Sequence, residues 1–303
     1  SNAGAEISLQ SESSSPKSPL NVTLKDFKIE TITEIIKKDS LLAKGTINGT
    51  AQLKNLTKNM TFTSDIDVTD LFVFGSPVGN LDIKVNNQSA NLLNADIALT
   101  GNENDVKILG NYNTTSSSFD LNLAMNQLQM NTLQGFTMNA ITNTEGYLSG
   151  ALKITGTTDA PRIIGDVKMN NVGMMIAKTG SDFRNINDKI GFTNRGIEFD
   201  NFKINDKDGN SLKINGQVLT QTYKDFAFNL DINAKDFKVV NSKKSNDALM
   251  YGILSIDAAL KVRGNLDLPK VDGRLAVADD TDFTFVLPQS CLLYTSPSPR
   301  DKR

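Results

Sequence analysis

Apolar residues alternate with polar or small residues from Leu148 to Met169, in the sequence LSGALKITGTTDAPRIIGDVKM. Leu152 and Ile154 carry the alternation up to a turn-rich connection at Gly156 to Pro161, and Val167 resumes it afterwards. Every second side chain of a β-strand faces the same side of the sheet. The pattern therefore predicts two strands joined as a β-hairpin.

The same pattern returns 108 positions later without a gap, and a weaker copy without the proline lies 101 positions earlier. Because a period of about 100 residues exceeds that of a solenoid coil, we expect a module of several strands used about three times in one sheet. The alternative is chance similarity among hairpins. The later copy matches at Leu260, Val262, Gly264, Asp267, Pro269, Gly273, Leu275 and Val277, and the earlier copy at Gly45, Gly49, Ala51, Leu53, Ile66 and Val68.

Alternating segments separated by turn residues continue along most of the chain. Their spacing of roughly 8–12 residues is typical of an all-β meander. One phase slip within Asn21 to Ile29 predicts a β-bulge. Further strands are expected around residues 62–74, 81–85, 93–99, 106–108, 121–125, 174–176, 190–192, 197–204, 212–218, 226–234, 237–239, 256–262 and 283–287.

Four segments depart from this pattern. Isoleucines at helical spacing predict a short helix at Glu30 to Asp39, which we interpret as a plug or cap over the apolar face of the sheet. A second short helix is expected at Leu133 to Ala140. Gly180 to Asp188 is expected to be a loop, and Ser11 to Pro19 is rich in Ser and Pro, as flexible linkers are.

The expected fold is all-β: an elongated, folded-over, mainly antiparallel sheet, shaped like a gutter, with an apolar concave face and one or two short helices. About 20 strands at roughly 4.8 Å each would extend on the order of 95 Å. Such a sheet must cover its apolar side, either by closing into a sandwich or by bending into an open gutter that takes a ligand. We divide the chain into a linker (1–20), a first part of the sheet (21–145), a second part (146–289) and a tail (290–303).

Composition narrows the chemistry that the chain can perform. Its 303 residues contain 39% hydrophobic residues, no Trp, no His and one Cys, and its net charge is −2. The missing His removes the commonest general base and metal ligand, and the balanced charge gives no basic surface for nucleic acid. No apolar run is long enough to span a membrane. We therefore assign no catalytic, metal or cofactor-binding residues.

Acidic turns are the remaining candidates for chemistry. Asn205 to Asn210 contains Asp208 and Gly209 and shares part of the spacing of a calcium loop, but it lacks the bidentate Glu. An Asp-Gly pair between two apolar segments favours a hairpin turn. Asp159 and Asp267, each two residues before a Pro, are likewise interpreted as turn residues.

The end of the chain differs from the rest. The sequence CLLYTSPSPRD, from Cys291 to Asp301, resembles the conceptual translation of a sequencing adapter. We therefore exclude residues 290–303 from the expected fold. The chain begins with Ser1 and carries no signal peptide, so we expect it to be a piece of a longer protein.

The hairpin above is followed, in order, by GFTNRGIEFDNFKINDKDGNSLKINGQV, FAFNLDINAKDFKVVNS, MYGILSIDAALKVRGNLDLPKVDGRLAV and FTFVLPQ. It is preceded by LKDFKIETI, by ING at Ile47 to Gly49, and by FDLNLAMNQLQ. This succession of segments resembles the TamB family of the AsmA-like superfamily, specifically its Bacteroidetes members. Each motif alone is a sequence pattern common to many β-hairpins. The order in which the motifs follow one another makes the resemblance specific.

The resemblance implies a non-enzymatic protein of envelope biogenesis. Such a protein is anchored in the inner membrane by a segment outside this piece, crosses the periplasm, conducts phospholipid between the two membranes or aids outer-membrane protein assembly, and meets an outer-membrane barrel of the TamA/BamA type. The partners expected are phospholipid acyl chains and that barrel, reached through a C-terminal part that this piece lacks. The residues expected to line a lipid groove are Leu152, Ile154, Val167, Phe226, Phe228, Leu230, Ile232, Leu260 and Val262.

Two other classes of function remain open from the sequence. A structural or partner-binding sheet protein would fill its apolar face with its own side chains, and the same Leu, Ile and Val residues build cores. A hydrolytic β-protein is disfavoured because no His completes a catalytic triad.

Overall fold

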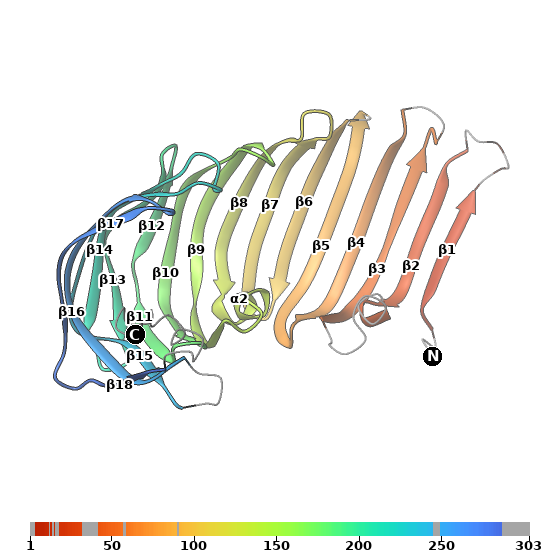
Figure 1. The fold of residues 1–303 in the computed structure, drawn as a ribbon. Coiled ribbons are helices and arrows are strands. Elements are labelled where there is room, and N and C mark those ends of the chain that lie inside the picture. Colours follow the sequence, from red (N-terminus) through yellow and green to blue (C-terminus); the bar gives the residue numbers. More distant parts are fainter. Residues whose placement is uncertain are drawn as a thin grey trace, which may run out of the picture.

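The computed structural model describes residues 4–11, 13, 15, 18–31, 42–56, 59–89, 91–244 and 249–286. Within these residues, the strands form one sheet of 18 strands, and every pairing in it is antiparallel. Figure 1 shows the strands side by side from β1 to β10, and the sheet curling over at the opposite end, where β13 to β18 lie. The expected all-β, elongated and antiparallel fold is confirmed.

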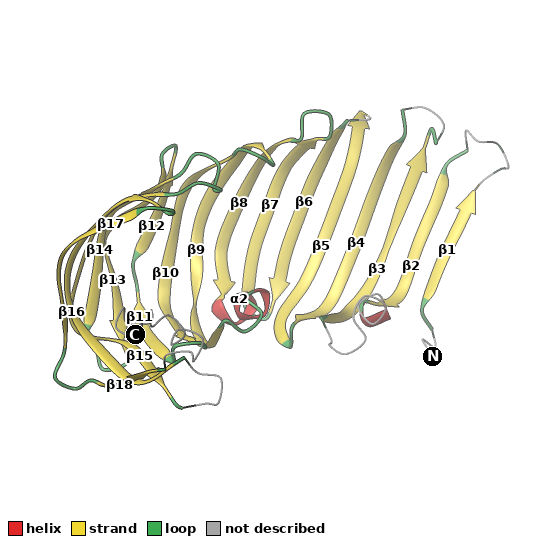
Figure 2. Ribbon diagram, in the orientation of Figure 1, coloured by secondary structure: helices red, strands yellow, loops and turns green. Residues whose placement is uncertain are grey.

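The first half of the sheet leads into a short helix, which Figure 2 shows at the lower ends of the strands. Its elements are β1 (Glu6–Ser11), β2 (Leu20–Lys28), β3 (Ala43–Lys54), β4 (Thr61–Val73), β5 (Ser76–Ser89), β6 (Leu92–Gly101), β7 (Asn104–Asn113), β8 (Ser118–Gln129) and the helix α2 (Met130–Phe136).

The second half contains the longest strands and the curled end. Its elements are β9 (Ile141–Thr157), β10 (Pro161–Ile176), β11 (Ser181–Ile186), β12 (Lys189–Thr193), β13 (Gly196–Asp206), β14 (Ser211–Leu219), β15 (Ala227–Ser242), β16 (Met250–Asn265), β17 (Pro269–Val277) and β18 (Asp282–Phe285). β11 and β12 both pair with β10 and with β13, and β17 and β18 both pair with β16.

The predicted hairpin forms, and its repeats share its register. Gly156 pairs with Pro161 at the end of β9–β10, as Gly264 pairs with Pro269 at the end of β16–β17. Farther along each hairpin, Gly165 has a φ of 136° and its counterpart Gly273 a φ of 141°. A Cβ on either glycine would lie 2.0 or 2.1 Å from a carbonyl oxygen of the neighbouring strand, so both positions require glycine.

β-bulges interrupt several strands at one kind of sequence. Register shifts follow Leu24, Phe199 and Ala234, within LKDFK, FDNFK and AKDFK. In each bulge an Asp or Asn has positive φ, and its backbone N–H donates to an Asn or Asp side chain of the next strand. A bulge bends its strand, and it returns the following Phe to the apolar face, where Phe202 and Phe237 are buried. The bulge predicted in Asn21 to Ile29 is confirmed.

Three expectations are corrected by the structure. Gly180 to Asp188 is not a loop but contains β11, because Phe183 stacks on Phe237 of β15 with ring centroids 5.7 Å apart and Ile186 is buried. Residues 1–20 are not all linker, since β1 pairs along its whole length with β2. α2 begins and ends earlier than the predicted helix 133–140.

Three further predictions remain open. Glu30 and Thr31 are helical, but the rest of the predicted helix 30–39 and the tail 290–303 lie outside the described residues. The division of the sheet between residues 145 and 146 falls inside β9 and remains a prediction.

Candidate functional site

One face of the sheet carries an unbroken row of apolar residues or glycine from β2 to β17. Residues that pair directly across strands have side chains on the same face of the sheet. We call this face the dry face. The row consists of Phe27, Ile47, Val68, Leu81, Leu99, Val106, Met125, Gly150, Val167, Ile190, Phe199, Gly216, Leu230, Val262 and Val271.

Among the described residues, no second sheet covers the dry face. Most of its side chains are half-buried, and only three small clusters of buried apolar residues form on it. On the last strands the face is open: Val271 is 57% exposed and Leu275 is 62% exposed. A continuous apolar face of this width that stays half-exposed is a surface for apolar ligands or partners.

The opposite face, which we call the wet face, carries charges in cross-strand pairs. Lys84 lies 2.8 Å from Asp82 on its own strand and 3.8 Å from Asp65 on the neighbouring strand, and Arg263 lies 2.8 Å from Asp231 on the neighbouring strand. The hydrogen bond that Lys84 donates to Asp82, together with nearby carboxylates, raises the pKa of Lys84. These pairs are solvent-exposed, so they keep the wet face soluble and contribute little to stability.

A cavity of about 350 Å³ lies on the dry face where α2 approaches the strands. Thr132 is the one polar residue in its lining. The other lining residues come from β4 to β8 and from α2: Leu71, Val78, Leu81, Ile97, Leu99, Val106, Ile108, Leu123, Met125, Leu128, Leu133 and Phe136.

α2 is fixed against the strand ends by buried polar groups. The Asn104 side-chain amide donates to the carbonyl of Val78 and to the Thr132 hydroxyl, both at 2.8 Å. The side-chain oxygen Oδ1 of Asn104 accepts a hydrogen bond from the backbone N–H of Gln129 at 2.8 Å. Asn104 and Thr132 are both buried, so these bonds are shielded from water.

The residues predicted to line a groove lie mainly on the dry face, in two separate groups. Leu230 pairs with Val262 and Ile232 with Leu260, on β15 and β16. Leu152, Ile154 and Val167 lie on β9 and β10, and the strands β11 to β14 separate them from the first group. Phe228 belongs to the β15 group and faces Gly264.

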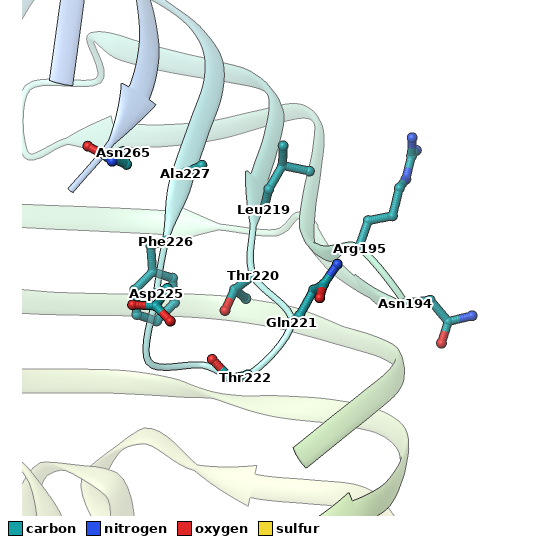
Figure 3. A pocket seen from close by; sticks show the side chains of 10 residues that line it. All are labelled: Asn194, Arg195, Leu219, Thr220, Gln221, Thr222, Asp225, Phe226, Ala227 and Asn265. Carbon is teal, nitrogen blue, oxygen red and sulfur yellow. The ribbon is translucent and has the colours of Figure 1, made fainter. Parts of the chain in front are cut away.

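Phe226 precedes β15 and lines a different hollow, at the ends of the strands. This pocket of about 530 Å³ is formed by loops at residues 194–195 and 220–226 together with Asn265. Figure 3 shows Leu219, Thr220 and Phe226 around it, while the side chains of Asn194 and Arg195 extend outward. Its lining mixes apolar and polar groups, unlike the cavity beside α2.

The acidic loop at Asn205 to Asn210 is a turn, as predicted. The buried Asp206 carboxylate accepts the backbone N–H groups of Asp208 and Asn210 within the turn. It also accepts the backbone N–H of Lys238 from β15 at 3.0 Å. Asp206 therefore holds the β13–β14 hairpin to β15, which is a structural role.

Sequence reasoning missed the cavity beside α2. Most of its strand residues were within the predicted strands 62–74, 81–85, 93–99, 106–108 and 121–125, but nothing in their alternation distinguishes them from other apolar positions. One feature of the sequence points to this cavity. Immediately after β8, a segment that carries Leu133 and Phe136 breaks the alternation of apolar and polar residues.

The fold and its apolar face define an elongated, folded-over β-sheet protein that keeps one face dry and largely open. The family model for the TamB C-terminal domain matches residues 200–294. The match covers about a third of the chain, and in these residues the chain is similar to the TamB family, a family of envelope biogenesis through outer-membrane assembly or lipid transport. No curated protein and no solved structure matches the chain. None of the helices in the described residues is long and apolar enough to cross a membrane.

Proposed function

We propose that this chain is a non-enzymatic segment of a periplasmic lipid conduit, in which the dry face carries phospholipid acyl chains between the inner and outer membranes. The observation that supports it best is the unbroken apolar row from Phe27 to Val271. The row runs across the strands, so it follows the long axis of the sheet. At about 4.8 Å per strand, this path is on the order of 70 Å long.

The energetics of lipid transfer favour such a path. Each methylene exposed to water costs about 0.8 kcal/mol, and a diacyl lipid contains about 30 of them, so the unassisted transfer costs on the order of 25 kcal/mol. A continuous apolar face keeps the chains out of water at each point of the path. The headgroup stays in water beyond the edge of the face, and no nucleotide or cofactor is required to lower this barrier.

The residues proposed to contact the chains are those expected from the sequence. They are Leu152, Ile154, Val167, Phe226, Phe228, Leu230, Ile232, Leu260 and Val262. An inner-membrane anchor and an outer-membrane barrel of the TamA/BamA type would complete the conduit through parts of the protein outside this chain.

A second candidate function is a structural sheet with a closed core. It is favoured locally by the cluster of Met130, Val172, Ile186 and Phe202, which is filled by the chain's own side chains. Stacking of Phe183 on Phe237 closes the same end of the sheet further. In this alternative, the protein would bind a partner through its wet face.

The two functions are separated by a matched pair of variants. Leu230→Asp places a carboxylate on the dry face, whereas Asn229→Asp places the same group one residue away on the exposed wet face. Each protein is purified from bacteria, and bound lipid is quantified by native mass spectrometry and extraction. The conduit predicts as much phospholipid on Asn229→Asp as on the wild type, and less on a folded Leu230→Asp. A stable wild type free of lipid would refute the conduit and favour the closed core.

A further inference from the structure

The cavity beside α2 is distinct from the rest of the dry face, because it has an end wall. Leu133 lines the cavity and also packs against the buried cluster that contains Met130 and Val172. On one side of α2 the dry face is therefore hollow, over β4 to β8. On the other side, the buried cluster of Met130, Val172, Ile186 and Phe202 packs directly behind α2.

α2 is held in place too closely to move as a lid. A Cβ on Gly135 would lie 2.3 Å from the carbonyl oxygen of Val73, so the helix backbone rests directly on the end of β4. The buried Asn104 and Thr132 bonds fix the same face of the helix, at the preceding turn. Figure 1 shows α2 across the lower ends of the strands around β6 to β8.

The end of α2 presents an apolar side chain at the mouth of the cavity. Phe136 lines the cavity and yet is 59% exposed. Met138, two residues beyond it, is 73% exposed. Exposed large apolar residues beside an apolar hollow mark a site that buries them when it is occupied.

We propose that this cavity binds one acyl chain end-on, with α2 as its fixed end wall and Phe136 at its mouth. The proposal rests on the proposed function. It places the first acyl-chain binding site of the conduit on β4 to β8, rather than at the predicted residues of β15 and β16. Two observations indicate an acyl chain as the ligand, namely the apolar lining of the cavity and its volume. The single polar residue of the lining, Thr132, already donates to the carbonyl of Pro77, so the cavity offers no group for a polar ligand.

The volume of the cavity beside α2 suits one acyl chain. A water-sized group takes about 30 Å³, so a cavity of about 350 Å³ holds on the order of a dozen methylene groups. This space is sufficient for one chain of medium length. The filled cluster behind α2 stops the chain from advancing along the base of the dry face, so a longer chain must leave its remainder outside the mouth.

The test is a titration of the full chain with dodecanoate and octadecanoate, followed by native mass spectrometry. The wild type is expected to bind one dodecanoate at this site. Leu133→Trp fills the cavity from α2, and Phe136→Asn removes the apolar mouth at a position that is already exposed and tolerant of change. Each is expected to weaken dodecanoate binding roughly tenfold or more. Leu109→Trp, on the exposed wet face, is the matched control and is expected to bind as the wild type does.

Every outcome decides the proposal. If Leu133→Trp does not fold, the Phe136→Asn titration decides alone. Unchanged binding in both folded variants, with loss in Leu230→Asp, would place the chain on β15 and β16, overturning this site while leaving the conduit intact. Fatty acid binding at several equivalents that no single variant reduces would also overturn it. Absence of any bound lipid or fatty acid from the wild type would overturn the proposed function as well.

Discussion

Asn104 is the single side chain whose loss should most directly release α2 from the sheet. It is buried, and its three hydrogen bonds reach the Val78 carbonyl, the Thr132 hydroxyl and the Gln129 N–H. Asn104→Ala removes all three bonds without adding volume. The change leaves buried polar groups of the helix start and of β5 without this partner.

The expected cost follows from those groups. A buried donor or acceptor left without a partner costs about 1–3 kcal/mol. The Thr132 hydroxyl retains its bond to the Pro77 carbonyl, so the Gln129 N–H and the Val78 carbonyl dominate the loss. We therefore expect Asn104→Ala to lower the free energy of unfolding by roughly 3 kcal/mol.

Urea-induced unfolding followed by circular dichroism measures this loss, and amide hydrogen exchange locates it. Exchange should accelerate first in α2 and at the start of β5. Asn94→Ala is the matched control, because Asn94 donates one long bond of 3.3 Å to Asn86 on the half-exposed wet face, and its loss should cost under about 0.5 kcal/mol. A cost below about 1 kcal/mol for Asn104→Ala, or unchanged exchange in α2, would refute the fixed end wall.

Three further predictions concern the sheet itself. In urea unfolding, Gly216→Ala should destabilise the protein by roughly 2 kcal/mol more than Gly209→Ala. Both glycines have positive φ, but only at Gly216 would a Cβ meet a carbonyl oxygen, at 2.1 Å. Equal losses of stability would count against this close approach of β14 to β15. Tyr223→Phe should stabilise the protein by about 1 kcal/mol, because within the described residues the buried Tyr223 hydroxyl has no hydrogen-bond partner. Burial raises the pKa of Tyr223 above 10.0, so the wild type should lose stability as the pH rises above 10.0, and the Phe variant should lose less; parallel pH profiles would contradict this. Lys153→Met should change stability by no more than about 1 kcal/mol, since its pair with Asp120 is exposed; a larger loss would show that the wet-face pairs act as a network.

The alternation of apolar residues was sufficient to predict the fold class and the dry face. Within β9–β10 and β15–β16, side chains of period two pair across strands on one face, because burial on one side leaves only one favourable register. The TamB resemblance was confirmed by the family match over residues 200–294. These features depend on local pattern, which a sequence displays directly.

Features that depend on distant contacts were not predicted. β11 is short and polar, and it forms because Phe183 reaches Phe237 on β15. α2 has no side-chain cap at Gln129, so its first residue carries no local signal. The bulges at FDNFK and AKDFK repeat the phase slip that was recognised only at LKDFK, and a search for an Asp or Asn before Phe within alternating segments would have found them.

The position of the candidate lining was likewise beyond local pattern. The predicted residues lie mainly on the dry face, but the cavity beside α2 arises from the helix crossing β4 to β8, a contact that alternation does not encode. Bulge curvature and helix placement together decide which part of one apolar face is hollow and which is filled.

The most direct measurement of the central claim is photocrosslinking of lipid along the sheet in living bacteria. A photoreactive amino acid is placed in turn at dry-face positions Leu81 and Leu260, and at wet-face positions Asn122 and Asn229, with phosphate-labelled phospholipid. The account predicts crosslinked phospholipid at both dry-face positions and at neither wet-face position. Equal crosslinking on both faces, or none at Leu81 and Leu260, would contradict an acyl-chain path along the dry face.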